Sequence, residues 1–283
     1  MNGSGLPPLD IPGILRKHDI RPSKGLGQNF LVSNKYLQKI VSAANIKPTD
    51  AILEIGPGLG SLTRYLALAG KSVTAVELDR KLIPLLEDIL SPYKNVNLIQ
   101  GDILHFDPAD ILEGNEYTVV ANIPYYITSN VIRHLLESTL RPRKMILTVQ
   151  KEVAERICAL PGDMSILAIS VQVFGNPRII DQIPASAFFP SPKVDSSVLY
   201  IEIHTDRRFT FSQLDTFFTL VKAGFSQKRK TLRNSLSARL GMPAENVEKL
   251  LIDCSIDPQR RAETLSLNEW EKLTTTLSNQ KSI

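Results

Sequence analysis

The stretch Ala51-Ile-Leu-Glu-Ile-Gly-Pro-Gly-Leu-Gly60 decides the fold. Its first five residues are mostly apolar and typical of a buried strand, and glycines follow at positions 56, 58 and 60. Glycine lets the backbone turn sharply and approach a ligand with no Cβ in the way. Because ligands of open α/β sheets bind at the carboxyl ends of strands, this stretch predicts a site for a nucleotide-type cofactor.

Around this stretch, short β-branched runs alternate with longer helical segments, which predicts an α/β fold with a parallel sheet and crossover helices. The predicted strands are 51–55, 72–77, 96–100, 118–122 and 145–150, and the predicted helices are 61–69, 80–90, 129–138 and 151–159. Most of these strands are apolar on both faces, as burial between two helix layers requires. Further along we expect a helix at 164–174 and strands at 178–183 and 194–204.

The pattern changes near residues 205–208, after which the chain is helical with polar breaks. We therefore expect an α/β domain over residues 1–205, with an N-terminal extension of 1–25, and a small all-α domain over 206–283. Two capping boxes are expected to start helices in the second domain, Ser212 with Asp215 and Ser266 with Glu269.

Composition limits the function classes. Lys and Arg outnumber Asp and Glu by 33 to 29, and the resulting charge of +4 slightly favours polyanionic partners. The two cysteines lie far apart and the four histidines are scattered singly, so no disulfide framework and no metal site is predicted. No segment approaches the ~18 apolar residues of a membrane span, and the first ten residues lack a signal peptide's apolar core. We expect a cytoplasmic protein.

Two acids narrow the kind of cofactor. The loop has the spacing G-x-G-x-G, and Ser61 stands where a dinucleotide-binding loop has its last glycine, so diphosphate binding is disfavoured. Glu77 ends a predicted strand, where its carboxylate can accept hydrogen bonds from ribose hydroxyls. Asp102 follows the next strand and can accept from an adenine amino group. Two simpler interpretations stay open: the glycines make only a tight turn, and Glu77 pairs with Lys71 or Lys81.

The tetrapeptide Asn122-Ile-Pro-Tyr125 ends another predicted strand, across the expected cofactor crevice. Adenine's amino nitrogen is a poor nucleophile because its lone pair is delocalised into the ring. The Asn122 amide oxygen and the Ile123 carbonyl can each accept one of its hydrogens, which aims the lone pair at a methyl donor, and Pro124 holds the turn. A turn of this composition also ends strands in many proteins with no catalytic role.

Aromatic side chains are available to hold an unstacked base. Tyr125 offers a stacking face, worth about 1–3 kcal/mol per base. Phe188, in Phe188-Phe-Pro-Ser-Pro192, can cover the other face. Simple core packing of Phe188 is the alternative, and Phe189 can exchange roles with it.

Together these residues resemble the ribosomal RNA adenine dimethyltransferase family, over residues 17–270 and in particular its small-subunit branch. The motifs that carry the resemblance are Leu26-Gly-Gln-Asn-Phe-Leu31, residues 54–60, Glu77-Leu-Asp79, Gly101-Asp102, residues 122–125, Phe188-Phe-Pro-Ser-Pro-Lys-Val-Asp-Ser196 and Gly224-Phe-Ser-Gln-Lys-Arg-Lys-Thr-Leu-Arg-Asn234. Gly27 before Gln28 favours this branch over the antibiotic-resistance branch, which modifies large-subunit RNA. The segment Pro161-Gly-Asp-Met-Ser-Ile-Leu-Ala168 departs from the family's Tyr-Gly-Arg-Leu-Ser-like segment.

The resemblance implies a Rossmann-like class I methyltransferase sheet, with S-adenosylmethionine as methyl donor and a small helical C-terminal domain. It implies two N6-methyl groups on each of two adjacent adenosines near the 3′ end of small-subunit RNA, within an immature 30S-type particle. We expect the enzyme to act as a monomer. The predicted cofactor-binding residues are Gln28, Asn29, Leu31, Gly56, Gly58, Glu77, Asp102, Ile103 and Asn122.

Basic residues predict how RNA is held. A run at the start of the second domain contains Lys222, Lys228, Arg229, Lys230 and Arg233, and a smaller cluster contains Arg141, Arg143 and Lys144. Such groups position RNA through its phosphates with little sequence discrimination, although a solvated helix face looks the same in sequence. Two other functions stay open: a ribosomal-RNA-binding assembly factor with secondary methylation, and a nicotinamide-dependent oxidoreductase.

Overall fold

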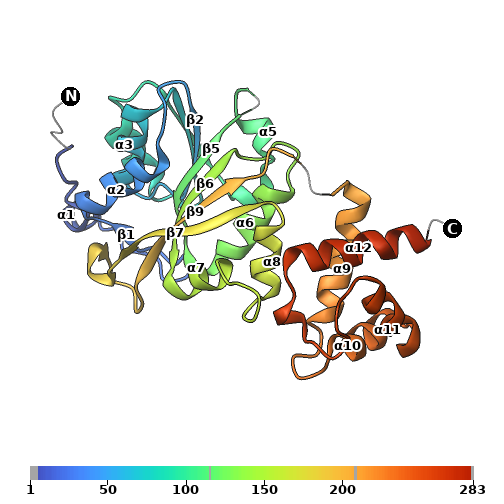
Figure 1. The fold of residues 1–283 in the computed structure, drawn as a ribbon. Coiled ribbons are helices and arrows are strands. Elements are labelled where there is room, and N and C mark those ends of the chain that lie inside the picture. The colour runs from blue at the N-terminus through green and yellow to red at the C-terminus, as the bar shows by residue number, and fades with distance from the viewer. Residues whose placement is uncertain (1–5, 115, 207–208, 282–283) are drawn as a thin grey trace. The chain divides into compact units, whose positions relative to one another are not determined.

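The computed structural model describes residues 6–114, 116–206 and 209–281 (Figure 1). Contacts divide the chain into two compact units, the first comprising Met1–Ala154 and Asn176–Ile203 and the second Glu155–Gly175 and His204–Ile283. The second unit thus starts within two residues of the predicted boundary and also contains residues 155–175. Residues 1–5, 115, 207–208 and 282–283, which belong to the predicted domains, lie outside the described residues.

A seven-stranded sheet forms the first unit, in the order β4-β3-β2-β5-β6-β9-β7. Its strands are β2 (Ala51–Ile55), β3 (Ser72–Glu77), β4 (Val96–Gln100), β5 (Thr118–Asn122), β6 (Lys144–Gln150), β7 (Gly175–Ile183) and β9 (Ser196–Ile203). The pairs β4–β3, β3–β2, β2–β5 and β5–β6 are parallel, whereas β9 is antiparallel to β6. The predicted α/β class is confirmed.

Helices connect these strands. Those between residues 34 and 172 are α2 (Asn34–Ala44), α3 (Ser61–Ala69), α4 (Ile83–Leu90), α5 (Pro108–Ile111), α6 (Thr128–Glu137), α7 (Lys151–Ile157) and α8 (Ile166–Gln172), with 3-10 turns η1 (Ile103–His105) and η2 (Tyr125–Ile127). Helices α2 and α3 pack against each other, α2 on β5, β6 and β9, and α3 on β3. Their buried side chains join those of the central strands in one apolar core.

Strand β4 forms at the predicted residues and is half-exposed, because it is the last strand of the sheet. Three predicted boundaries need correction. The helix predicted at 164–174 is shorter, and β7 begins at Gly175, before the predicted residue 178. Helix α9 (Phe211–Gly224) is capped by Thr210 with Gln213, two residues earlier than the predicted box at Ser212.

The N-terminal segment forms structure that the sequence pattern did not predict. Helix α1 (Ile11–Lys17) is capped by Asp10, whose Oδ1 accepts from the Gly13 N–H at 3.0 Å. Strand β1 (Phe30–Leu31) pairs antiparallel with β8 (Phe188–Phe189), which follows the 3-10 turn η3 (Ala185–Ala187). This small sheet joins two motifs that lie far apart in the sequence.

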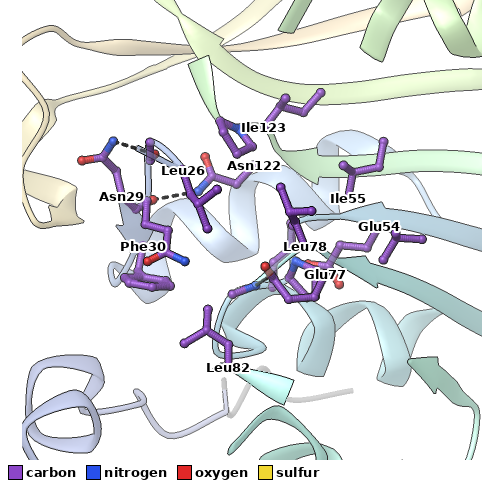
Figure 2. Close-up of a pocket in the computed structure, with 18 of the residues that line it drawn as sticks. Leu26, Asn29, Phe30, Glu54, Ile55, Glu77, Leu78, Leu82, Asn122 and Ile123 are labelled. Carbon is purple, nitrogen blue, oxygen red and sulfur yellow. Dashed lines mark hydrogen bonds between the residues drawn. The ribbon is translucent and has the colours of Figure 1, made fainter. Parts of the chain in front are cut away.

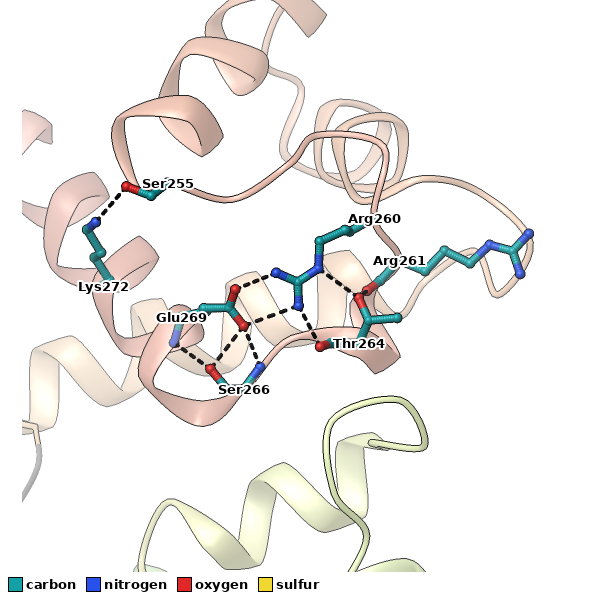
Figure 3. A network of polar contacts seen from close by, with 7 residues as sticks. All are labelled: Ser255, Arg260, Arg261, Thr264, Ser266, Glu269 and Lys272. Carbon is teal, nitrogen blue, oxygen red and sulfur yellow. Dashed lines mark hydrogen bonds and ion pairs between the residues drawn. The ribbon is translucent and has the colours of Figure 1, made fainter.

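The second unit is helical around Trp270. It contains α9, α10 (Leu232–Leu240), α11 (Ala244–Asp253), η4 (Ala262–Thr264) and α12 (Leu267–Lys281). The Trp270 ring is fully buried and stacks on Phe225 with ring centroids 6.1 Å apart. The predicted capping box of α12 is confirmed, since the Glu269 N–H donates to Ser266 Oγ at 3.3 Å and the Ser266 N–H to Glu269 Oε2 at 2.8 Å (Figure 3).

The atypical segment 161–168 belongs to this unit and has a defined conformation. Gly162, at a φ of 118°, donates its N–H to the Glu263 carbonyl at 2.9 Å, and the Met164 N–H donates to the same oxygen at 3.2 Å. Ser165 then caps α8 by accepting from the Ala168 N–H. The segment is therefore a turn held against η4, although it lacks the family's usual residues.

Candidate active site

A cavity lies where β2, β3 and β5 end at their carboxyl edges (Figure 2). All nine predicted cofactor residues line it, and so do Ile123, Pro124 and Tyr125. Residues 26–31, from the N-terminal segment, also line the cavity. The fold thus brings the predicted cofactor and catalytic positions together, with the exception of Phe188.

Glycine is required in the loop after β2. Gly56, Gly58 and Gly60 all have left-handed backbone conformations, with φ angles of 67°, 62° and 78°. A Cβ at Gly58 would stand 2.8 Å from the Phe30 ring, too close for any side chain. The loop therefore presents bare backbone to the cavity, which is what close approach of a ligand needs.

Glu77 holds the glycine loop in place. Its buried carboxylate accepts from the Gly58 N–H at 3.0 Å through Oε2 and from the Asp79 N–H at 2.8 Å through Oε1. Burial raises the pKa of Glu77, and these two hydrogen bonds oppose the increase. Among the described residues Glu77 forms no ion pair, so neither Lys71 nor Lys81 neutralises it. Each oxygen keeps a lone pair for a ligand hydroxyl.

Asp102 lies at the cavity wall just after β4. Its Oδ1 accepts from the Leu104 N–H at 3.0 Å and so caps the turn η1, which starts at Ile103. This bond fixes the carboxylate and leaves its second oxygen available. An amino group of an adenine ring is a suitable donor to that oxygen.

Asn122 is oriented by the N-terminal loop. Its Nδ2 donates to the Asn29 carbonyl at 3.1 Å, and Asn29 in turn donates from its own Nδ2 to the Gly27 carbonyl at 3.1 Å (Figure 2). Because the amide nitrogen is engaged, the group presents Oδ1 as its acceptor. Ile123 beside it is almost fully buried.

Tyr125 is tied to the sheet through its hydroxyl. The Tyr125 and Ser196 hydroxyl oxygens lie 2.7 Å apart, and Ser196 at the start of β9 is fully buried. Burial raises the pKa of Tyr125, so the hydroxyl stays protonated. Phe188 instead packs in the core opposite Leu31 and is not among the cavity residues, which fits its core-packing interpretation.

Two cavity residues escaped the sequence-based prediction. Tyr126, directly after the tetrapeptide, is 55% exposed and lines the cavity. Glu54 in β2 is 1% exposed, and its Oε2 has no hydrogen-bond partner among the described residues. Burial raises the pKa of Glu54 to about 8, and the nearby Glu77 carboxylate adds to the increase. An acid inside an otherwise apolar strand was the available signal.

The predicted RNA-binding basic residues differ in exposure and in whether they form an ion pair. Lys222, Lys228, Arg229 and Lys230 are exposed, whereas the Arg233 Nη1 lies 2.6 Å from Glu248 Oε2 of α11. Arg260 and Arg261 also lie here, because the Leu232 N–H donates to the Arg260 carbonyl at 2.7 Å. The Arg260 guanidinium pairs with Glu269, while the Arg261 side chain points away from this network (Figure 3).

The smaller basic cluster has structural partners. Lys144 is buried and donates to the carbonyls of Ala44 and Asn45 at the end of α2. Arg143 lies 3.3 Å from Asp50. Within the described residues, no cluster of His, Cys, Asp and Glu could hold a metal ion, and no helix is long and apolar enough to cross a membrane.

Comparison with known proteins shows the family to which the chain belongs. The family model for ribosomal RNA adenine dimethylases matches residues 20–280. The chain belongs to the ribosomal RNA adenine dimethylase family. A relative named ribosomal RNA small subunit methyltransferase A, from Dehalococcoides mccartyi (strain CBDB1), is 47% identical over 262 residues, which cover 92% of this chain and 90% of the relative.

Solved structures of this ribosomal RNA adenine dimethylase fold are also similar. A dimethyladenosine transferase from Plasmodium falciparum has a TM-score of 0.79 and 29% identity, covering 90% of this chain and 98% of that one. The 23S rRNA methyltransferase ErmE has a TM-score of 0.71 and 26% identity, covering 88% of this chain and 100% of that one. The chain is therefore an S-adenosylmethionine-dependent enzyme that dimethylates adenine in ribosomal RNA, and the oxidoreductase alternative is wrong.

The cavity fits this methyl donor. The bare backbone at Gly58 accommodates a ligand where a Cβ would meet Phe30, and fixed carboxylates stand at the ends of β3 and β4. Glu77 and Asp102 would hold the ribose hydroxyls and the adenine amino group, while Leu26, Leu78 and Ile103 supply apolar wall. When bound, S-adenosylmethionine supplies an electrophilic methyl group whose carrier leaves as a neutral thioether.

Proposed function

We propose that this chain dimethylates N6 of two adjacent adenosines near the 3′ end of small-subunit ribosomal RNA, within an immature 30S-type particle. The observation that carries the site assignment is the Asn122 amide, which is fixed by Asn29 beside the cavity with Oδ1 as its acceptor. We also propose that the enzyme works as a monomer in the cytoplasm and that residues 206–283, the helical part of the second unit, form the RNA-binding domain.

Asn122, Ile123 and Tyr125 act together on the target base. The Asn122 Oδ1 and the Ile123 carbonyl each accept one amino hydrogen, which draws the nitrogen's lone pair out of the ring plane. Tyr125 stacks on the base, and Pro124 keeps the backbone of the turn in shape. No strong general base is needed, because the nitrogen loses its proton after it has gained the methyl group.

The relatives support the small-subunit branch. Those with names specifying small-subunit methylation are 38–47% identical to this chain, and they include proteins from Clostridioides difficile (strain 630) and Bacillus pumilus (strain SAFR-032). The 23S rRNA methyltransferase ErmE is 26% identical. We therefore favour small-subunit RNA over the large-subunit RNA of the antibiotic-resistance branch.

A methylation assay tests the proposal. Purified protein, labelled S-adenosylmethionine and immature small subunits that lack these methyl groups are expected to yield dimethyladenosine, measured by nucleoside mass spectrometry. Large subunits prepared in the same way serve as the control. Label confined to the large subunit would overturn the branch assignment. An assembly-factor role predicts, instead, that a methylation-dead protein still restores subunit maturation.

Tyr125 provides a sharper test of base stacking. Tyr125→Ala is expected to raise the KM for RNA and lower kcat/KM by about 5–150-fold, the equivalent of about 1–3 kcal/mol of lost stacking. Tyr125→Phe keeps the ring but loses the bond to Ser196, so a decrease of about fivefold is expected. Tyr126→Phe removes the same hydroxyl from the exposed neighbour and is the matched control. Equal activity of the Ala and Phe variants would contradict the stacking role.

A further inference from the structure

The segment before the cavity carries a group of exposed cations. Arg16, Lys17, Arg21 and Lys24, here called the N-terminal basic segment, all have exposed side chains. Only one acid, Asp19, interrupts them. None of the four forms an ion pair within the part of the chain that the structure describes. Their charge is therefore available to an external anion.

Hydrogen bonds hold the end of this segment at the cavity. The Gly27 N–H donates to the Lys24 carbonyl at 3.1 Å, and the Ser23 N–H donates to Gln28 Oε1 at 2.7 Å. Gln28 Nε2 donates to Asp79 Oδ2 at 2.8 Å, which ties the turn to the end of β3. A Cβ on Gly27 would stand 3.2 Å from the Tyr126 ring. Lys24 is therefore hydrogen-bonded to Gly27, which lines the cavity.

A structural role accounts for only half of these charges. Arg16 and Lys17 occupy the last turn of α1, where cations stabilise the helix dipole. Arg21 and Lys24 follow the end of that helix and have no such role. Two other basic residues of the first unit have structural partners. Arg143 pairs with Asp50, and Lys144 donates to the Ala44 carbonyl at the end of α2.

We propose that Arg21 and Lys24, with the rest of the N-terminal basic segment, bind the RNA phosphates that flank the target adenosine. This inference rests on the proposed function, because it assigns a second grip on the same substrate. An extruded base must be held against the cost of unstacking, and phosphate contacts fix register and orientation. Phosphate contacts made by the same compact unit as the cavity fix the position of the nucleotide being methylated directly.

The double variant Arg21→Gln/Lys24→Gln tests this surface in the full-length protein. Two phosphate contacts on unpaired RNA change the salt dependence of binding by about 1.4 in log K per log salt, and their loss lowers affinity about tenfold near physiological salt. We expect the KM for immature small subunits to rise by this factor, with kcat nearly unchanged. Affinity for S-adenosylmethionine, measured by calorimetry, should stay at the wild-type value.

Lys71→Gln/Lys94→Gln is the matched control. It removes the same charge from exposed residues that precede β3 and β4, at the sheet edge opposite the cavity. If both double variants have the same salt dependence and KM, the proposed surface is wrong. If the wild-type protein binds the particles without methylating them, the proposed function fails, while the comparison of salt dependences still decides whether the N-terminal basic segment binds RNA.

Discussion

Replacing Asn122 by alanine is expected to lower kcat for adenine methylation by roughly 10²–10³-fold, the range for removal of one preorganised polar group from an active site. The amide is held by Asn29, so its Oδ1 needs no reorganisation when charge develops on the target nitrogen. Nothing else in the proposed chemistry replaces this acceptor. Single-turnover methylation of immature small subunits measures the effect, free of product release.

A second variant, Asn122→Asp, and the KM for RNA separate an effect on chemistry from an effect on folding. Asn122→Asp keeps an acceptor oxygen but cannot donate to the Asn29 carbonyl, so its rate should lie between those of wild type and Asn122→Ala. The KM for RNA should change little in either variant, because stacking on Tyr125 is unaffected. A kcat for Asn122→Ala within about threefold of wild type would contradict the proposed role and, with it, the placement of the reaction.

The sequence predicted the central sheet because its local and long-range signals agree. Short apolar runs at residues 51–55, 72–77 and 118–122 have the pattern of buried parallel strands, and all three form as predicted. Errors arose at element ends. The sequence predicted Ser212 with Asp215 as the capping box of α9, whereas the helix begins two residues earlier and Thr210 with Gln213 forms the box.

The site was predictable at strand ends and much less so elsewhere. The carboxyl ends of parallel strands lie at one edge of the sheet, so the sequence could predict that the glycine loop, Glu77 and Asn122 lie close together. The sequence pattern could not predict the hydrogen bond from the Asn122 side chain to the Asn29 carbonyl. Periodicity does not encode a contact between a loop and a distant strand. Phe188 is the converse case: it stands in a motif that suggests a role at the base, and its side chain packs in the core.

Glu54 offers the second large effect, in stability. Its pKa of about 8 in the fold exceeds the ordinary value of 4.5, so the native state holds a proton that the unfolded chain releases. The stabilisation from this proton is complete below about pH 4.5 and is lost as pH rises through about 8. Each pKa unit between the native and unfolded states corresponds to about 1.36 kcal/mol, so the stabilisation lost by pH 9 amounts to about 5 kcal/mol.

Glu54→Gln keeps the shape of the side chain without its titration. Between about pH 5 and about pH 9 its free energy of unfolding is therefore expected to fall by about 4 kcal/mol less than that of wild type, as measured by urea denaturation. Other titrating groups are common to both proteins and cancel in this difference. The exposed Glu87, replaced by glutamine, is the matched control and should follow the wild-type curve. Parallel curves for Glu54→Gln and wild type would mean that Glu54 is ionised in the native protein. The cavity would then place two negative carboxylates, Glu54 and Glu77, behind the glycine loop, rather than the single charge that the buried position of Glu54 predicts.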